Sequence, residues 1–329
     1  MEFQVFLRQQ LARHPGMQTQ DVIKLCYQAA FGAEHILQDK AAAEAYFYQE
    51  YGEAPATDEP LFEAISPEVC RVNFGAWKRE NLTPQWLFRM FVHSRYRAEE
   101  ARFLEYLQAA LCREEVDAYL AGGIRPVHHS HSYREANHPH YRIVTSRFAA
   151  LLPVLQKLKG KKPGVIALDG RAASGKTTMA GLLAKALDAP VIAMDDFFLP
   201  PELRTPQRLA EIGGNVHYER FREEVLPGLQ TGEAFSYRAF DCTEMAYGAT
   251  VDIPKSQYRI VEGSYSHHPA LGNYANLKLF LEVDPQTQMA RIKKRNGERL
   301  AEIFRTRWIP MEEAYFDGFS IREQADIRL

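Results

Sequence analysis

A glycine-rich stretch in the middle of the chain constrains the fold more than any other feature. Residues 170–177 read G-R-A-A-S-G-K-T and match the pattern G-x-x-x-x-G-K-[S/T]. An apolar run, residues 165–168, precedes the stretch, and residues 178–187 follow it with helical periodicity. Glycines let the backbone curl so that successive N–H groups point inward, and the following helix N-terminus adds positive potential. The stretch therefore predicts a phosphate-binding loop between a buried strand and a helix.

The side chains of this loop predict a nucleoside triphosphate as the ligand. Lys176 is placed to reach the terminal phosphates, and the Thr177 hydroxyl is placed to hold Mg²⁺. A glycine-rich turn with a chance lysine is the structural alternative, which the flanking strand and helix patterns disfavour. We expect ATP and Mg²⁺ as cofactors, and we assign nucleotide binding to Gly170, Ala172, Ala173, Ser174, Gly175, Lys176, Thr177 and Thr178.

Length, composition and charge bound the class of protein. The chain has 329 residues, 46% hydrophobic and 25% charged, which is enough for two domains with separate cores. A formal net charge of -2 argues against nucleic acid or an anionic membrane as the main partner. The four cysteines lie far apart, and no apolar run approaches a membrane span. We expect a cytoplasmic protein.

The two halves of the chain differ in periodicity. Residues 1–158 predict a mostly α-helical domain, with helices at 3–13, from 19, 44–51, from 84, 98–120 and 143–158. A polar stretch with Gly and Pro, residues 159–164, predicts the boundary. Residues 163–329 then alternate predicted strands (165–168, 191–194, 235–238, 258–261, 277–283, 325–329) with predicted helices (176–187, 218–230, 285–295, 300–307). This alternation predicts an α/β fold, a parallel sheet with helices on both faces.

Acidic residues follow two of the predicted strands. Asp195 and Asp196 come directly after strand 191–194, and Glu262 ends strand 258–261. Ligands of such a fold bind at the carboxyl ends of its strands. One aspartate is placed there to orient or deprotonate an acceptor hydroxyl, and these carboxylates, with Thr177, are placed to hold Mg²⁺. A solvated turn and a simple capping acid are the structural alternatives.

A basic segment near the end of the chain is a candidate lid. Residues 291–299 carry five cationic side chains, and Arg305 and Arg307 follow. Cations on a segment that closes over a triphosphate neutralise charge during transfer, so we add Arg291 and Arg295 to the nucleotide-binding residues. Cations also favour a helix C-terminus, which is the ordinary explanation.

Together, the loop, the two acidic strand ends and the basic segment resemble the uridine kinase and phosphoribulokinase group of small-molecule kinases, over residues 163–329. The D-D-F-F run at 195–198 is also similar to nicotinamide riboside kinases. The resemblance implies a P-loop NTPase fold with a helical lid. It also implies a kinase that phosphorylates a hydroxyl of a small molecule, with Asp195, Lys176 and Glu262 as catalytic residues.

The acceptor side of the resemblance is less complete. Nucleoside kinases of this group carry an acid before the helix that begins here at residue 218, and this chain has none in the five preceding positions. His217 either takes the acceptor contact or caps the helix. We assign substrate binding to Asp196, His217, Tyr237 and Arg238.

The first half contains a histidine-rich stretch, residues 126–142, that holds five of the eleven histidines. The pairs His128–His131 and His138–His140 suit a transition metal, whereas neutral imidazoles suit phosphate or a substrate hydroxyl in a cleft. A polar interdomain loop is the third interpretation. Residues 31–35 and 70–78 are candidates to line a pocket with this stretch.

Three functions follow from these observations. The first is an ATP- and Mg²⁺-dependent kinase whose partner is a small-molecule hydroxyl acceptor, a nucleoside or another alcohol, with neither nucleic acid nor membrane as partner. The second is a nucleotide-gated switch or NTPase whose output is the helical domain. The third is a metal-binding or scaffold protein that uses the histidine-rich stretch. Homo-oligomerisation stays open.

Overall fold

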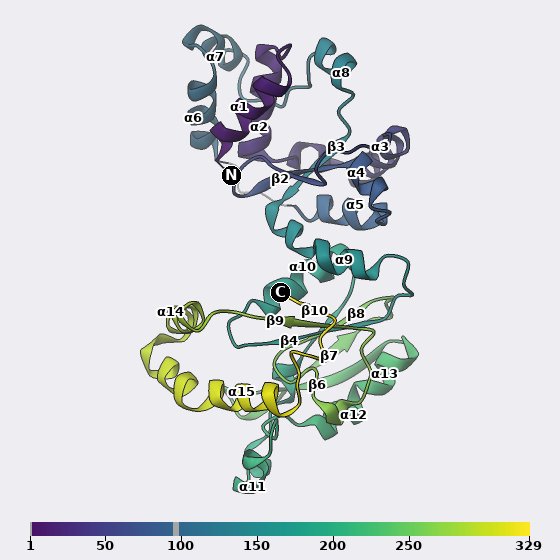
Figure 1. Cartoon of the computed structure of the whole chain (residues 1–329), viewed down its shortest axis with the longest axis vertical. Helices are drawn as coiled ribbons and strands as arrows, with labels where there is room; N and C mark the ends of the chain where they lie inside the picture. Colours follow the sequence, from purple (N-terminus) through teal and green to yellow (C-terminus); the bar gives the residue numbers. More distant parts are fainter. Residues whose placement is uncertain (1, 95–98) are drawn as a thin grey trace. The chain divides into compact units, whose positions relative to one another are not determined.

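The computed structural model describes residues 2–94 and 99–329. The chain divides into two compact units, unit 1 (Met1–Lys159) and unit 2 (Gly160–Leu329). Figure 1 labels the helices and strands of each unit. Each unit has its own buried residues and its own sheet, and each is described by itself.

Unit 2 is built on a five-stranded sheet in the order β10–β9–β4–β8–β5, and all neighbouring strands are parallel. Every residue of the central strand β4 is buried, as expected when both faces of a sheet are covered. The predicted α/β fold is confirmed. The strands are β4 (Val165–Gly170), β5 (Val191–Ala193), β8 (Arg259–Glu262), β9 (Leu277–Leu281) and β10 (Ile327–Arg328).

The helices of unit 2 follow the sequence pattern in part, and the pattern did not predict the helices Pro206–Ala210 and Ile309–Gly318. The predicted helix 176–187 is α10, whereas predicted helix 218–230 breaks at Val225, because Pro227 suits the first turn of a new helix. Predicted helix 285–295 and the first part of predicted helix 300–307 fall in one element, α14, which is kinked at Gly297 (φ 78°, ψ 169°), and residues 304–307 lie in a π-helical turn. The helices are α10 (Lys176–Leu187), α11 (Pro206–Ala210), α12 (Tyr218–Glu224), α13 (Leu226–Thr231), α14 (Pro285–Ile303) and α15 (Ile309–Gly318), with a π-helical turn at Phe304–Trp308.

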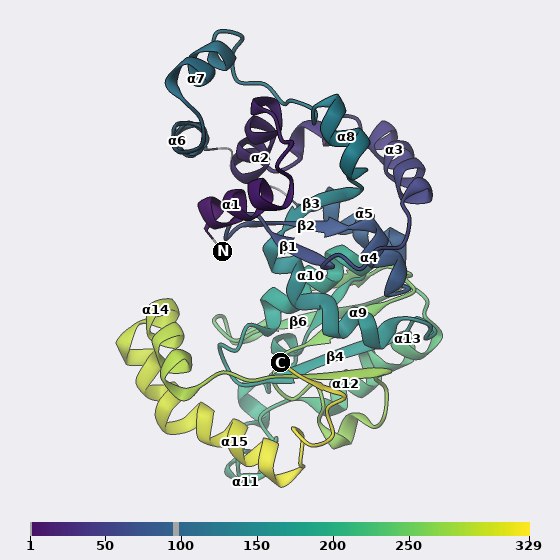
Figure 2. The same ribbon diagram turned by 45° about the horizontal axis from the view of Figure 1, so that its top comes forward.

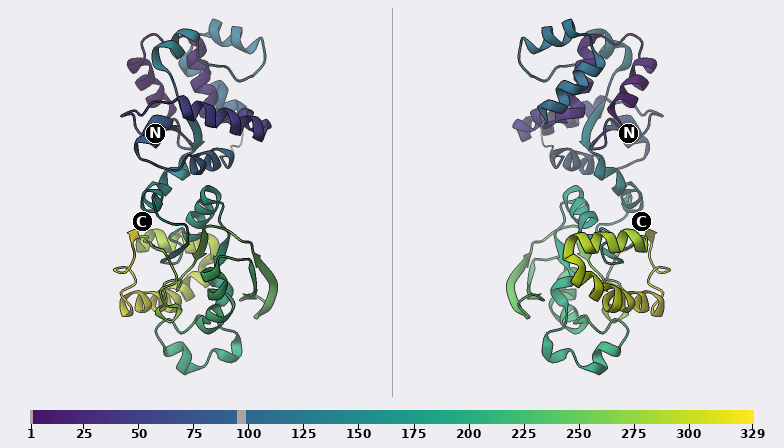
Figure 3. Two further views of the ribbon diagram at one scale, coloured as in Figure 1. Left: turned by 90° about the vertical axis from the view of Figure 1, so that its right-hand side faces the viewer. Right: turned by 90° about the vertical axis from the view of Figure 1, so that its left-hand side faces the viewer.

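One predicted strand does not join the parallel sheet. Residues 235–238 belong to β6 (Phe235–Asp241), which pairs antiparallel with β7 (Ala246–Ile253) in a separate hairpin. The Asp241 carboxylate accepts the N–H groups of Thr243 and Glu244 and so stabilises the turn. Figure 3 shows this hairpin and the α14–α15 segment at opposite edges of the unit. The sequence pattern missed β7 because most of its residues are exposed.

Unit 1 is mostly helical, as predicted, and also contains a three-stranded antiparallel sheet, β1–β2–β3. Figure 2 shows its strands side by side, with α1 and α2 toward one end and α4 and α5 toward the other. Its strands are β1 (Phe62–Ala64), β2 (Val69–Asn73) and β3 (Tyr141–Thr145), and its helices are α1 (Phe3–Arg13), α2 (Thr19–Phe31), α3 (Lys40–Glu53), α4 (Phe74–Arg79), α5 (Pro84–Val92), α6 (Glu100–Ala110), α7 (Arg113–Leu120), α8 (His131–Asn137) and α9 (Leu152–Leu158).

Two predicted helices of unit 1 are wrong in part. The helix expected over 98–120 is two helices, because Cys112 caps α7 and its N–H bonds the Glu115 carboxylate at 3.0 Å. The expected start at Ala98 lies outside the described residues. The helix expected over 143–158 begins as strand β3, continues as a 3₁₀ turn (Ser146–Leu151) and becomes helical only at α9.

The remaining 3₁₀ turns are Glu34–Gln38, Met194–Phe197, Pro201–Leu203 and Pro269–Leu271. In the part of the chain that the structure describes, no helix has both the length and the apolar character needed to cross a membrane. The four cysteines are free thiols.

Candidate active site

The order of the sheet brings three functional segments together. Strand β8 lies between β4 and β5, and all three run in the same direction. The glycine-rich loop follows β4, Glu262 is the last residue of β8, and Asp195 lies two positions after β5. Parallel strands end at the same edge of a sheet, so these residues share one edge.

The glycine-rich loop is shaped by close backbone packing. Gly170 has φ 138°, and a Cβ at this position would lie 2.2 Å from the carbonyl oxygen of Leu281 at the end of β9. Gly175 has φ 106° and directly precedes α10. The first N–H groups of a helix have no intrahelical acceptor, so this loop ends in exposed donors. The predicted nucleotide-binding residues from Gly170 to Thr178 thus run from the last residue of β4 through the loop into this first turn.

Lys176 lies under the loop rather than in solvent. Its residue is 9% exposed, and its ammonium donates to the carbonyl oxygens of Gly170 (2.7 Å) and Arg171 (2.9 Å). The side chain is therefore held at the loop by two charge-assisted hydrogen bonds. It places a positive charge beside the first turn of α10.

Thr177 and Glu262 form a pair of oxygen ligands. The Thr177 hydroxyl donates to Glu262 Oε1 at 3.2 Å. Burial, together with the neighbouring Asp195 charge, raises the pKa of Glu262, while Lys176 and the Thr177 hydrogen bond oppose the rise. A buried carboxylate beside a hydroxyl is a donor set that suits a hard cation such as Mg²⁺.

Asp195 lies in the 3₁₀ turn that follows β5, and its residue is exposed at the edge of the sheet. The surrounding protein still desolvates the carboxyl and raises its pKa; Lys176 opposes the rise, Asp196 adds to it, and Arg295 opposes it. Within the described residues, the Asp195 carboxylate takes no side-chain hydrogen bond. It is therefore available to a ligand and faces two cations.

Asp196 is held by the protein instead. The Tyr237 hydroxyl donates to Asp196 Oδ2 at 2.7 Å, and the Arg220 guanidinium donates to the Asp196 carbonyl oxygen at 2.6 Å. Arg220 also bonds the carbonyl oxygen of Arg238 at 2.8 Å and so ties the turn to the hairpin. Tyr237 is only 3% exposed. The two adjacent aspartates thus have different surroundings.

The other two predicted acceptor-side residues border the same turn. His217 caps α12 by accepting the Arg220 N–H at its Nδ1 (3.2 Å), and its own N–H bonds the Phe197 carbonyl oxygen at 2.6 Å. Arg238 is exposed, and its guanidinium donates to the Tyr247 carbonyl oxygen at 3.1 Å. The role of both as substrate ligands stays a prediction.

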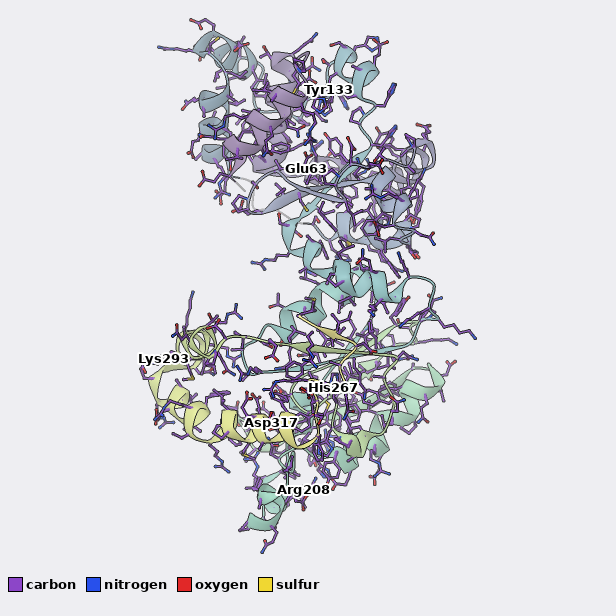
Figure 4. All side chains as sticks on the ribbon, in the orientation of Figure 1. Glu63, Tyr133, Arg208, His267, Lys293 and Asp317 are labelled. Carbon is purple, nitrogen blue, oxygen red and sulfur yellow. The ribbon has the colours of Figure 1, made fainter. Side chains whose placement is uncertain are left out.

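The basic segment contacts the loop through α14. Arg291 donates to the Ala173 carbonyl oxygen at 3.0 Å, and Gln288 donates to the Ala172 carbonyl oxygen at 3.1 Å. Arg295 lies near enough to lower the pKa of Asp195. Figure 4 labels Lys293 on α14 and Asp317 on α15, which mark the two parts of this segment.

Sequence reasoning missed a second set of contacts to the loop, from α15. The buried Glu312 carboxylate accepts the Ala172 N–H (3.0 Å) and the Ser264 hydroxyl (2.7 Å). Glu313 accepts from the Arg171 guanidinium at 2.8 Å. The sequence around these two adjacent acids does not indicate that Glu312 is buried. Its partner in the loop, Ala172, lies 140 residues earlier in the chain.

Comparisons with protein-family models and with curated proteins found no match. Among solved structures, this chain is similar to a possible uridine kinase from Bacillus stearothermophilus, at 18% identity and TM-score 0.44 over 56% of this chain and 97% of that chain. A candidate fructose transport system kinase from Silicibacter sp. TM1040 is similar at 24% identity and TM-score 0.45, over 55% of this chain and 98% of that chain. Shikimate kinase from Bacteroides thetaiotaomicron is similar at 17% identity and TM-score 0.26, over 50% and 85% of the two chains.

Proposed function

We propose that this protein is an ATP- and Mg²⁺-dependent phosphotransferase that phosphorylates a hydroxyl of a small molecule. The observation that carries the proposal is the meeting of the glycine-rich loop, Glu262 and Asp195 at one edge of the parallel sheet. Phosphoryl transfer is catalysed mainly by positioning and by electrostatic stabilisation, and this edge supplies a phosphate loop, cations and carboxylates together.

The residues present fit a nucleoside triphosphate and a divalent cation. The Ser174 hydroxyl oxygen is buried in the loop without a hydrogen-bond partner among the described residues, and the first turn of α10 offers further donors. Thr177 and Glu262 supply oxygen ligands for the cation. When bound, the nucleotide would supply the phosphoryl group, and Mg²⁺ would supply positive charge that stabilises its transfer.

Each side chain then has a defined task. Asp195 positions the acceptor hydroxyl and takes its proton, because its carboxylate is uncommitted and its raised pKa makes it a stronger base. Lys176 and the arginines of α14, Arg291 and Arg295, neutralise the charge that develops on the transferred group. Closure of the basic segment would exclude water and so favour transfer over hydrolysis.

The acceptor binds, in this proposal, beside the turn that carries Asp195. Asp196 is fixed by Tyr237, and His217 and Arg238 border the same turn, so polar groups surround the position of the hydroxyl. A small alcohol with several polar groups, a nucleoside included, fits this environment. A small molecule is thus the proposed partner.

The test is ADP release with ATP and Mg²⁺ across a panel of acceptors that includes uridine, cytidine, nicotinamide riboside, pantothenate, glycerate and simple sugars. Turnover should require one acceptor and should fall by a factor of about 10² to 10⁴ in Asp195→Asn. Glu202→Gln, which removes an exposed acid further along the same segment, is the matched control and should leave turnover unchanged. Hydrolysis that ignores every acceptor and survives Asp195→Asn would favour a nucleotide-gated switch instead.

A further inference from the structure

Unit 1 contains a polar pocket that the proposed phosphotransferase does not use. The pocket has a volume of about 160 Å³ and is lined from four parts of unit 1: the end of α1, the segment before β1, strands β1 and β2, and the end of the histidine-rich stretch. Arg71 and Asn73 meet His138 and His140 there, so one of the two predicted pocket-lining stretches does lie against the histidines. Figure 4 labels two of the lining residues, Glu63 on β1 and Tyr133 on α8.

A buried arginine with too few acceptors forms one wall of this pocket. Arg71 is 5% exposed. Its guanidinium has a bond of 3.1 Å to Gln10 and two long bonds of 3.4 Å, to Glu63 and to Gln28. Its Nε has no partner among the described residues. Buried arginines are normally paired through short, often bidentate bonds, so this cation is under-coordinated by the protein.

The charge around Arg71 is not balanced locally. Glu63 is its only carboxylate partner among the described residues, and Glu63 also accepts from Arg13 at 3.0 Å and from Gln10 at 2.9 Å. Two guanidinium groups therefore share one carboxylate. The lining also carries the imidazoles of His14, His138 and His140, which offer further ring nitrogens to a ligand, and a second acid, Glu59. Two arginines thus face two carboxylates in the lining, but no described ion pair joins Glu59 to either arginine.

The wall behind Arg71 is rigid. The Tyr141 ring centroid lies 4.4 Å from the guanidinium carbon and the Phe6 ring centroid 5.0 Å from it, so Arg71 packs against two aromatic side chains. The Tyr141 hydroxyl bonds His129 Nε2 at 2.9 Å, and His129 Nδ1 bonds the buried Asp21 at 3.0 Å. This chain of hydrogen bonds fixes Tyr141, so Arg71 is organised before a ligand arrives.

The geometry does not favour a metal in this pocket. Among the residues that the structure describes, no three His, Cys, Asp or Glu side chains gather in an arrangement that suits a metal ion. His129 is engaged by Asp21 and Tyr141, and His131 lies on the exposed side of α8 beside Glu135. The histidines of this stretch therefore have separate environments.

We propose that this pocket binds a small oxyanion, the phosphate or carboxylate group of a small metabolite, through Arg71 and Arg13. The two guanidinium groups supply planar donors that match such oxygens, and the imidazoles at the pocket wall contact the rest of the molecule. The pocket lies within unit 1, so the proposal stands independently of phosphotransfer in unit 2.

The test is calorimetric titration of the full chain with inorganic phosphate and, separately, with malonate. Lys176→Ala serves as the background, because it weakens phosphate binding at the glycine-rich loop. One anion per chain should bind, with a dissociation constant of about 1 mM or lower. Tight binding of phosphate alone, or of malonate alone, identifies the oxyanion group that the pocket selects.

Two further variants locate the binding. Arg13→Met changes a half-exposed rim residue that folding does not require, and it should weaken binding about tenfold. Arg8→Met, on the exposed side of the same helix, is the matched control and should bind as the parent does. Arg71→Met should abolish binding, with its melting temperature recorded to check the fold. Binding of neither anion at millimolar concentration, or equal binding by the Arg13→Met and Arg8→Met proteins, would overturn the proposal.

Discussion

Two aspartates, Asp21 in unit 1 and Asp195 in unit 2, differ in how far the surrounding protein satisfies their carboxylates with hydrogen bonds. Asp21 is fully buried and accepts four hydrogen bonds, from Gln18 N–H, His129 Nδ1, Ser130 N–H and the Ser130 hydroxyl. Burial by itself raises the pKa of Asp21, but the hydrogen bonds from Ser130, Gln18 and His129 outweigh it and lower the pKa.

Asp195 has the opposite surroundings. Its carboxylate takes no side-chain hydrogen bond among the described residues, and desolvation raises its pKa. A carboxylate that the protein satisfies contributes to stability, whereas one that the protein leaves unsatisfied is poised to accept a proton or a ligand. We therefore expect Asp21 to matter for folding and Asp195 for function.

The largest expected effect tests the functional side of this comparison. Asp195→Asn should reduce acceptor-dependent turnover by about 10² to 10⁴ while the free energy of unfolding in denaturant stays within about 0.5 kcal/mol of the parent. The raised pKa of Asp195 adds a pH signature: turnover should fall on acidification at a pH above that of an ordinary aspartate. A variant that unfolds easily instead would make Asp195 a structural residue.

The second prediction tests the structural side. Asp21→Asn should lower the free energy of unfolding by about 3 kcal/mol, because it leaves His129 and Ser130 with a weaker partner in a buried site. Asp117→Asn, on the exposed face of α7, should change it by less than about 0.5 kcal/mol. Denaturant unfolding read by tryptophan emission measures both, since Trp77 and Trp86 are buried in unit 1. If the two variants were equally stable, Asp21 would not have the structural role that distinguishes it here from Asp195.

The third prediction uses acidification of unit 1. Burial lowers the pKa of His129 to about 3, so between pH 6.5 and 5 the unfolded chain takes up a proton at this residue and the folded unit does not. Stability should therefore fall as the pH falls, by up to about 2 kcal/mol over this range. A Trp308→Phe chain, whose remaining tryptophans lie in unit 1, reports this loss, and His129→Gln should flatten the dependence.

A chain with Trp77→Phe and Trp86→Phe, whose remaining Trp308 lies in unit 2, should show the opposite sign, because of the carboxylates of this unit. The pKa values of Asp195, Glu262 and Glu312 are all raised, so these groups bind protons more readily in the folded unit than in the unfolded chain. Their contribution supports folding on the acid side and is lost as the pH rises.

The smallest effect concerns the second aspartate of the turn. Tyr237→Phe removes the hydroxyl that bonds Asp196 and should cost about 1 kcal/mol of stability. The hairpin would hold the turn less firmly, so the KM for the acceptor should rise while the KM for ATP does not. Tyr247→Phe removes a hydroxyl from the exposed strand β7 and is the matched control. An unchanged acceptor KM in Tyr237→Phe would mean that the hairpin does not contribute to acceptor binding.

The most accurate sequence predictions concern features that neighbouring residues in the chain determine. The bounds of α1 and α10 agree with the apolar periodicity, and the glycine-rich loop could be placed because its residue types and its flanking elements are all local. The order of strands was not predictable in the same way, although the acids at the ends of β5 and β8 indicated which edge would be used.

Long-range pairing explains most of what sequence reasoning missed. Residues 141–145 have a helix-compatible pattern but pair with β2, about seventy residues earlier in the chain. The break at Cys112 was hidden because Phe103, Leu107 and Val116 are buried on both sides of it, so the apolar period continues across the cap. The bonds from Glu312 to the loop and from Tyr237 to Asp196 depend on tertiary structure alone.

The kinked segment from α14 to α15 has a mechanical consequence. Gln288 and Arg291 near the beginning of α14 donate to loop carbonyls, and Glu312 and Glu313 near the beginning of α15 accept from Ala172 and Arg171. The segment is thus attached to the loop at two places, with Gly297 and the π-helical turn between them. It can bend between these two attachment points, but it cannot move as a flap that is free at one end. Its movement toward the loop is therefore limited in range and costs the conformational entropy of only a short span.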